Sequence, residues 1–178
     1  MRSSTSAAVV LTLVAALSFS VPSASAACGS ADATASQASK RALVRATLCV
    51  LNTERARRDL PRLRLNSKLS SAARGHSRAM VSSEFFSHDS ADGSSFVDRI
   101  RASGYLSGAS GWYVGENIAY GSGDRSSARS IGRAWMNSQP HRANVLSRSF
   151  HEIGIGVAFG TPVRQGGGTY TTDFGRRS

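Results

Sequence analysis

The stretch EIGIGVAFG, residues 152–160, constrains the fold of this chain more than any other. Large apolar side chains stand at every second position from Ile153 to Phe159, and glycine or alanine stands at the positions between them. This alternation has the two-residue period of a β-strand. A strand face made of glycine and alanine lets another element pack directly against the backbone. We therefore predict a strand here, closely covered on its small-residue face.

The rest of the chain predicts helices first and strands last. Apolar residues recur at helical spacing over 40–58 and 66–86, with shorter helical patterns over 95–104 and 125–138. The segment QPHRANVL then indicates a turn and one further helical turn. A second alternating segment, 169–175, follows the strand above after a glycine-rich loop, which predicts an antiparallel hairpin. Helices before strands indicate an α+β fold, with helices against an antiparallel sheet.

The first residues are typical of an export signal. Arg2 precedes the apolar run AAVVLTLVAAL, 7–17, and a small-residue stretch SASA follows. The run is too short to span a bilayer. We predict a signal peptide over 1–26, a secreted mature chain and no transmembrane segment in it. The alternative is a lipoprotein attached through Cys28, but the leucine that usually precedes a lipidated cysteine is missing.

Cys28 and Cys49 are the only cysteines. An even number in an exported chain favours a disulfide, and two cysteines allow one intramolecular pairing. The bond would tether the small, polar segment 27–42 to the first helix and contribute about 3 kcal/mol in the chain-entropy model. The alternative is two free thiols, with Cys49 buried on the helix. Residues 43–178 are long enough for one domain with its own core.

Basic residues outnumber acidic ones, 22 to 11. They are scattered and are not interleaved with an aromatic ladder, so we expect no nucleic-acid partner. For an exported protein, such a charge is compatible with anionic cell-wall polymers or phospholipid headgroups. We favour a solvated basic surface without a specific partner, because net charge says little about specific binding.

The segment WYVGENIAYG, 112–121, places Glu116 inside an apolar run. A buried ionised carboxylate needs a partner or shifts its pKa. His88, in a polar loop, and His141, after a predicted helix, are candidates. The absence of H-E-x-x-H excludes a zincin on motif grounds, and no G-x-S-x-G elbow exists. Cys49 is a poor nucleophile because it lies on an apolar helical face and is predicted to be disulfide-bonded.

Several separated motifs follow one another along the chain, in the order LNTERARR, FFSHDSADGSSFVDRI, GENIAYG, WMNSQPHRANVL, EIGIGVA and YTTDFG. This ordered set resembles the CAP superfamily, which contains cysteine-rich secretory proteins, antigen 5 and pathogenesis-related proteins. The likeness is to the short bacterial form and covers about residues 43–175. It implies a three-layer α–β–α sandwich with a central antiparallel sheet. It also implies a cleft with two histidines and two acids, which in some members holds a divalent metal.

Carried over by motif, His88, Glu116 and His141 occupy three of the four cleft positions. The second acid usually stands three residues after the helical tryptophan, and that position here is Ser138. Two imidazoles and one carboxylate could form a zinc first shell with one open position, so these three residues are the tentative metal ligands. The missing acid removes one ligand and one general base, which weakens a catalytic role.

Four further residues receive structural interpretations. His76 and His151 match no cleft position, and we interpret them as surface or helix-face residues. We interpret Asn117 as structural. We place Trp135 in the core, where its indole N–H needs a partner.

Three functions stay open. The first is a secreted, monomeric binding or interaction module for a lipid, a sterol or a cell-wall ligand. The second is a metal-dependent hydrolase or peptidase that uses His88, Glu116 and His141. In the third, this cluster is a buried structural network and function lies on surface loops. We favour the first, because the catalytic set is incomplete and polar clusters are only probabilistic evidence of activity.

Overall fold

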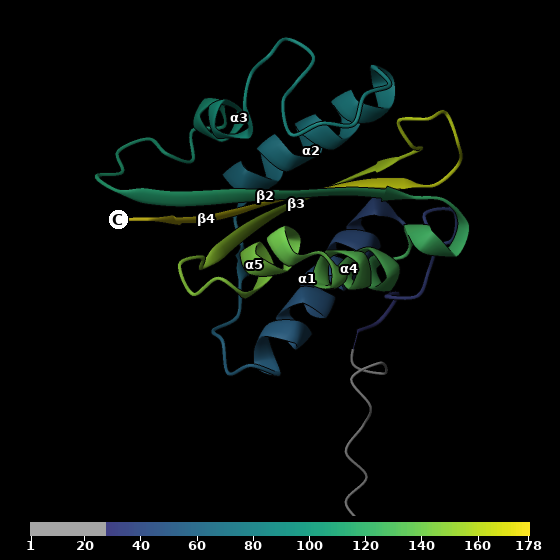
Figure 1. The fold of residues 1–178 in the computed structure, drawn as a ribbon, viewed down its shortest axis with the longest axis horizontal. Helices are drawn as coiled ribbons and strands as arrows, with labels where there is room; N and C mark the ends of the chain where they lie inside the picture. Colours follow the sequence, from purple (N-terminus) through teal and green to yellow (C-terminus); the bar gives the residue numbers. More distant parts are fainter. Residues whose placement is uncertain (1–27) are drawn as a thin grey trace, which may run out of the picture.

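The computed structural model describes residues 28–178, so the signal peptide predicted over 1–26 lies outside the described residues. Over 28–178, none of the helices has both the length and the apolar character that a bilayer span requires. The domain has three layers, with helices on both faces of one sheet (Figure 1). This confirms the predicted α–β–α sandwich.

The middle layer is a four-stranded sheet in the order β1-β3-β4-β2. Its strands are β1 (Arg64–Leu65), β2 (Trp112–Gly121), β3 (Glu152–Phe159) and β4 (Gly168–Arg177). The long strands pair antiparallel, and β3 and β4 form the predicted hairpin. The predicted central antiparallel sheet is confirmed for these long strands, and the whole sheet is mixed because β1 runs parallel to β3 at one edge. This strand is a two-residue link between two helices, so its direction follows from their packing.

Two helical layers cover the sheet (Figure 1). One layer contains α1 (Lys40–Ala56), α4 (Ala128–Asn137) and α5 (Gln139–Leu146), and the other contains α2 (Ser67–Ser82) and α3 (Phe96–Ala102). Polar side chains cap four of the helices by accepting a backbone N–H, namely Ser39, Asn66, Ser95 and Ser127. The predicted helix over 125–138 is shorter because Gly123–Ser126 forms a separate 3-10 turn and Ser127 then caps α4.

The glycines of β3 let α2 lie directly on the sheet. A Cβ atom at Gly154 would collide with the backbone of Leu69, and one at Gly156 would collide with the backbone of Ala73. The close cover predicted for this strand face is therefore confirmed. Ile153, Ile155 and Val157 of β3 point to the other face and join the main core between the sheet and the α1 layer, whereas Phe159 at the end of the strand is exposed.

Cys28 and Cys49 form the predicted disulfide, with their Cα atoms 5.6 Å apart. The bond attaches the N-terminal segment to α1. A second tie reaches α4, where Arg129 Nε lies 2.6 Å from Asp32 Oδ1. The segment before α1 is thus held against α1 and α4.

Candidate functional site

Glu116 lies in the middle of β2, which is an edge strand of the sheet. Its side chain points toward the α2–α3 layer, and the residue is 5% exposed. In the next strand, Asp173 is its direct partner in register. Because directly paired residues project to the same side of a sheet, two carboxyl groups meet at this buried position.

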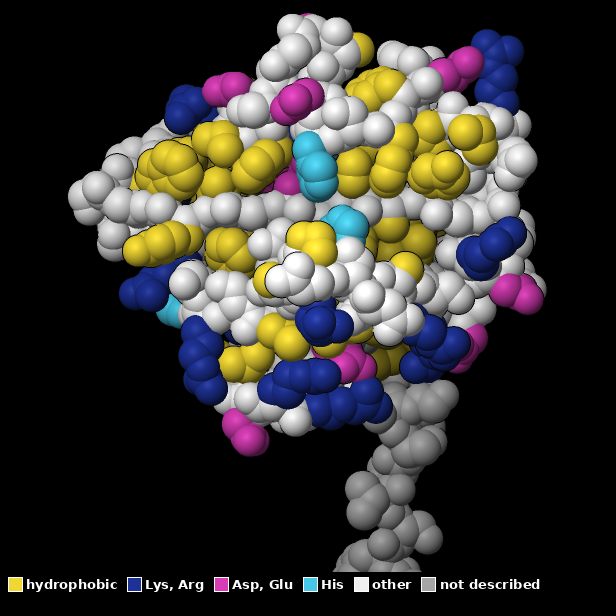
Figure 2. Space-filling model, viewed as in Figure 1, with side chains coloured by type: hydrophobic (Ala, Val, Ile, Leu, Met, Phe, Trp, Pro, Cys, Tyr) yellow, Lys and Arg dark blue, Asp and Glu magenta, His cyan; other side chains and the backbone are white. Residues whose placement is uncertain are grey.

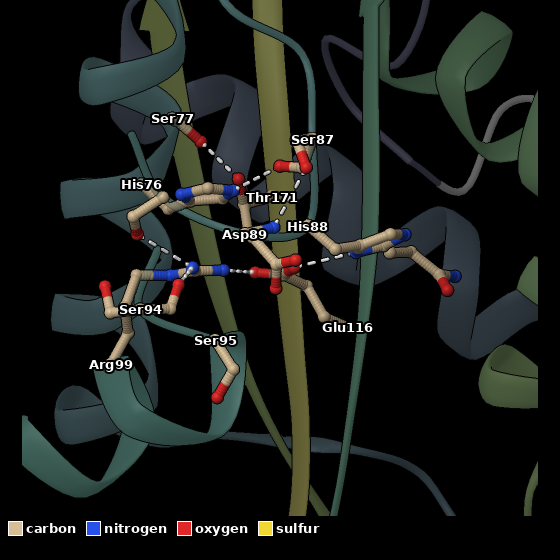
Figure 3. Close-up of polar contacts among 12 residues, drawn as sticks. His76, Ser77, Ser87, His88, Asp89, Ser94, Ser95, Arg99, Glu116 and Thr171 are labelled. Carbon is tan, nitrogen blue, oxygen red and sulfur yellow. Dashed lines mark hydrogen bonds and ion pairs between the residues drawn. The ribbon is translucent and has the colours of Figure 1, made fainter. Parts of the chain in front are cut away.

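Both oxygens of Glu116 are engaged (Figure 3). His88 Nδ1 donates to Oε1 at 2.8 Å, and Arg99 Nη2 donates to Oε2 at 2.7 Å. Arg99 also donates to Ser90 Oγ at 3.0 Å and to the Ser94 carbonyl at 3.3 Å. Glu116 is thus a paired carboxylate held by a loop histidine and a helix arginine. The predicted contact with His88 is confirmed.

The sequence analysis missed Arg99, which comes from α3. Ser95 and Asp98 form a capping box that begins this short helix, and Arg99 lies in its last turn. Arg99 lies in the motif FFSHDSADGSSFVDRI, but the family resemblance assigned no cleft role to it. The available signal was the demand of a buried Glu116 for a cation, together with the position of Arg99 in the same segment as His88.

Asp173, which is 1% exposed, was also not among the predicted site residues. Burial raises the pKa of Asp173 well above its usual range, the Glu116 carboxylate raises it further, and Arg99 opposes them. The raised pKa favours the neutral form of the Asp173 carboxyl beside the Glu116 carboxylate. Asp173 reaches this position because β4 pairs with β2 in a register that sets it opposite Glu116, and the pairing of these two strands was not predicted from the sequence.

His141 stands apart from this cluster. Its Nδ1 is hydrogen-bonded to Ser138 Oγ at 2.8 Å, and its backbone carbonyl accepts from Asn117 Nδ2 at 3.0 Å. The hydrogen bonds of Glu116 go to His88 and Arg99, so the predicted contact between Glu116 and His141 is not formed. Consecutive β2 residues project to opposite faces, which puts Glu116 toward α3 and Asn117 toward α5. Burial, and then nearby His88, lower the pKa of His141.

Side chains of the α1 layer protect the outer edge of β2. Trp135 Nε1 donates to the Ile118 carbonyl at 3.1 Å, and Asn144 Nδ2 donates to the Glu116 carbonyl at 3.1 Å. Asn144 also donates to Asn117 Oδ1 at 2.9 Å. Trp135 is buried and its indole has a partner, as predicted, and Asn117 is structural. These bonds cover backbone groups that a bare edge strand would expose.

His76 lies on one face of α2, but this face is buried rather than at the surface. The residue is 1% exposed, and its Nε2 donates to the Ser87 carbonyl at 2.8 Å (Figure 3). Burial lowers the pKa of His76. The bond holds the loop residue immediately before His88, so His76 positions the loop that approaches Glu116.

The predicted trio does not fit a zinc first shell in this arrangement. Across residues 28–178, no group of three or more His, Cys, Asp or Glu side chains is placed to hold a metal ion. Glu116 has no uncommitted oxygen, and Arg99 brings a positive charge to 2.7 Å from Oε2. A second cation there would be repelled.

A shallow hollow of about 270 Å³ opens beside His141. Its lining is mostly apolar and consists of Phe86, Ile118, Ala119, Tyr120, Ala134, Trp135, Ser138 and His141. The rings of Phe86 and Tyr120 meet edge to face, 4.9 Å between centroids, and both residues are more than two-fifths exposed. Figure 2 shows two histidines near the middle of this surface, with apolar side chains on both sides. The hollow thus joins an apolar wall to a polar end.

Comparison with known proteins agrees with this fold and this set of motifs. The model of the Cysteine-rich secretory protein family, CAP, matches residues 48–173. The chain belongs to this family. Bacillus subtilis YkwD is 35% identical over 105 residues, which cover 59% of this chain and 38% of that protein. This chain thus spans about two-fifths of the length of that relative.

Two solved structures share the fold. An extracellular protein with an SCP domain from Bacillus anthracis is similar with a TM-score of 0.58 and 25% identity, covering 77% of this chain and 43% of that one. An outer surface protein from Borrelia burgdorferi is similar with a TM-score of 0.65 and 17% identity, covering 79% of this chain and 97% of that one. The second likeness shows the fold alone.

Proposed function

We propose that this CAP domain is a secreted, non-catalytic binding module that takes an amphipathic ligand, a lipid or a sterol, in the hollow beside His141. The observation that carries the proposal is the commitment of both Glu116 oxygens to His88 and Arg99. A general base needs a free oxygen within reach of a substrate proton. Glu116, the one acid among the cleft positions that the family resemblance implies, therefore acts as the carboxylate of a structural ion pair.

The hollow supplies the binding chemistry. Phe86 and Tyr120 offer exposed ring surface to an apolar body, while His141 and Ser138 offer hydrogen bonds to a polar head. Its volume, about 270 Å³, is just below the usual range for small-molecule sites. We infer that the hollow receives one part of the ligand, such as one ring system, and leaves the remainder outside.

Three features support export. The N-terminal residues have the pattern of a signal peptide. A disulfide persists best in an oxidising compartment, and Cys28 and Cys49 form one. The similar structure from Bacillus anthracis is described as extracellular.

Binding of a fluorescent fatty acid and a fluorescent sterol to the purified mature protein tests the proposal. We expect saturable binding of one of them. Ala134 is exposed at the wall of the hollow, so Ala134→Phe fills the space and should weaken binding about tenfold. Val163→Ala is the control, because Val163 is exposed in the β3–β4 loop outside the hollow. Absence of saturable binding, or equal binding by Ala134→Phe, contradicts the proposal.

The alternative, a metal-dependent hydrolase using His88, Glu116 and His141, requires a different arrangement. Glu116 would have to leave Arg99, and His141 would have to approach it. Separating the buried pair leaves an arginine that is only 13% exposed in its side chain without its carboxylate, which is costly. We therefore favour the binding module.

A further inference from the structure

The end of the sheet where β2 begins and β4 ends carries a second hollow. Its volume is about 490 Å³, and its lining is Gly111, Trp112, Tyr113, Arg176, Arg177 and Ser178. None of these residues lines the hollow beside His141. Two large aromatic residues and two arginines thus gather where the proposed function uses none of them.

Strand register places each aromatic ring beside an arginine. Trp112 pairs with Arg177, and Tyr113 pairs with Arg176. Directly opposed residues have Cβ atoms about 5 Å apart on the same face of the sheet. Each face of this ribbon end therefore presents one aromatic ring next to one guanidinium.

The backbone around these pairs is well anchored. Ser178 N donates to the Gly111 carbonyl at 3.0 Å, and Ser110 N donates to the Ser178 carbonyl at 2.9 Å. The Arg177 guanidinium lies 5.3 Å from the centre of the Tyr105 ring, and the Tyr105 hydroxyl donates to Glu152 at 2.7 Å. Stacking on Tyr105 orients Arg177 without using its charge on a carboxylate.

The arginines lack acidic partners. Within residues 28–178, none of the ion pairs includes Arg176 or Arg177. The segments 99–115 and 174–178 contain no Asp or Glu. Meanwhile Trp112 is 42% exposed and Tyr113 is 61% exposed. Exposed aromatic rings beside uncompensated guanidinium groups are the composition of a binding surface rather than of a core.

We propose that this ribbon end, Gly111–Tyr113 with Arg176–Ser178, binds an acidic oligosaccharide. Sugar rings lie against the exposed faces of Trp112 and Tyr113, and sugar carboxylates bond to Arg176 and Arg177. Guanidinium groups recognise carboxylates through paired, charge-assisted hydrogen bonds. Because an aromatic ring stands on each face, the ligand spans several sugar units rather than one. The inference is independent of the lipid or sterol in the other hollow.

Calorimetric titration of the mature protein with a uronic acid hexamer tests the proposal. A neutral hexamer of similar size and inorganic polyphosphate are the comparison ligands. We expect saturable binding of the acidic hexamer, at least about tenfold tighter than the neutral one. Trp112 should report binding by its fluorescence, because the other tryptophan, Trp135, is 1% exposed.

Matched variants separate this site from the general basic charge of the protein. Arg176→Gln combined with Arg177→Gln should weaken the acidic hexamer about tenfold. Arg41→Gln combined with Arg45→Gln removes equal charge from exposed positions on α1 and should change affinity less than about twofold. Trp112→Ala should also weaken binding, whereas Phe159→Ala, at another exposed aromatic residue, should not.

Three results would overturn the proposal. One is equal weakening by the two double variants, which would show binding by net charge alone. The second is equal affinity for the acidic and neutral hexamers. The third is polyphosphate binding as tightly as the acidic hexamer, with Trp112→Ala without effect on either ligand. Loss of lipid or sterol binding in Ala134→Phe with unchanged hexamer binding would show that the two sites are separate.

Discussion

At the scale of single residues, Glu116 organises the surface around β2. It bonds to a loop through His88 and to α3 through Arg99, and it lies directly opposite Asp173 of the neighbouring strand. Asn144 of α5 bonds to its carbonyl. Glu116 therefore has a structural role, because its contacts hold a loop and two helices against β2.

Removing the charge of Glu116 should therefore cost stability. In Glu116→Gln, Arg99 keeps a buried positive charge without its carboxylate, and we expect the free energy of unfolding to fall by about 3 kcal/mol. Urea unfolding measures the change. The control is Glu84→Gln, since Glu84 pairs with Arg164 at the surface, where the two side chains are 42% and 78% exposed. That variant should lose less than about 1 kcal/mol. Similar losses in the two variants would contradict the role assigned to Glu116.

His76 should make the stability depend on pH. Burial lowers its pKa in the folded protein, with smaller lowering by Arg99 and His88 and an opposing effect of Glu116. The folded state thus binds this proton less well than the unfolded state. The contribution is present above the ordinary histidine pKa and is lost as pH falls through the lowered value.

We expect His76→Gln to lose less stability than the wild type between about pH 7.5 and about pH 5. Urea unfolding at both pH values measures the two differences. The raised pKa of Asp173 acts in the opposite direction, so the test compares proteins that both contain Asp173. His151→Gln, at a partly buried position outside the cluster, should behave as the wild type does. Equal pH dependence in His76→Gln and the wild type would refute the assignment.

Zinc should leave the melting temperature unchanged. The fit of the trio to a metal is poor because Glu116 is bonded to Arg99 and His88. Thermal unfolding with and without about a tenfold molar excess of Zn²⁺ checks this, because a ligand that binds only the folded state raises the melting temperature. A rise in melting temperature that His88→Ala and His141→Ala each abolish would restore the metal hypothesis.

At the scale of elements, the close packing of α2 on β3 determines the position of the loop that contains Ser87 and His88. Because Gly154 and Gly156 bring the helix backbone onto the strand, α2 carries His76 deep under the loop that contains Ser87 and His88. The alternating glycines therefore influence the site indirectly, because they determine how close α2 and its His76 lie to the sheet.

Gly156→Ala should be strongly destabilising. The added methyl group would collide with the backbone around Ala73, and backbone cannot turn aside as a side chain can. We expect a loss of about 2–3 kcal/mol in the free energy of unfolding. In the control, Gly166→Ala, a Cβ atom would meet nothing within 4 Å. Chemical denaturation of both variants decides, and a Gly156→Ala protein as stable as the control would show that α2 can withdraw from the sheet.

At the scale of the whole molecule, the excess of basic residues and the disulfide both lie on one side of the sheet. The α1–α4–α5 side, residues 40–62 and 123–150, has twelve basic and three acidic residues, whereas residues 67–104 have five and four. Positive charge is therefore concentrated on the α1 side of the molecule. The disulfide lies on this same side, between Cys28 and Cys49.

The disulfide should act on the stability of the entire domain. It closes a loop with a sequence separation of 21, which restricts the unfolded chain. In the chain-entropy model, replacing both cysteines by serine should cost about 3 kcal/mol. Thermal and urea unfolding measure the loss, with the single surface change Ser36→Ala inside the loop as a control. A change below about 1 kcal/mol would mean that the unfolded chain is already restricted there.

Much of this molecule could be predicted from local sequence patterns. The period of EIGIGVAFG determined a strand and the need for close cover, and the helical spacing of apolar residues indicated the helices. The two cysteines allowed one pairing, and the ordered motifs indicated the family. Each of these features depends on neighbouring residues or on residues that a motif marks.

Only the tertiary structure decided what surrounds Glu116. Arg99 and Asp173 reach it from α3 and β4, and His141 is directed to the other side of β2. No local pattern contains these distances, because they depend on strand register and on the depth at which α2 packs. The sequence by itself determined that Glu116 needs partners, since burying a lone charge is costly. The fold decided that its partners are an arginine and a histidine rather than a metal-binding trio.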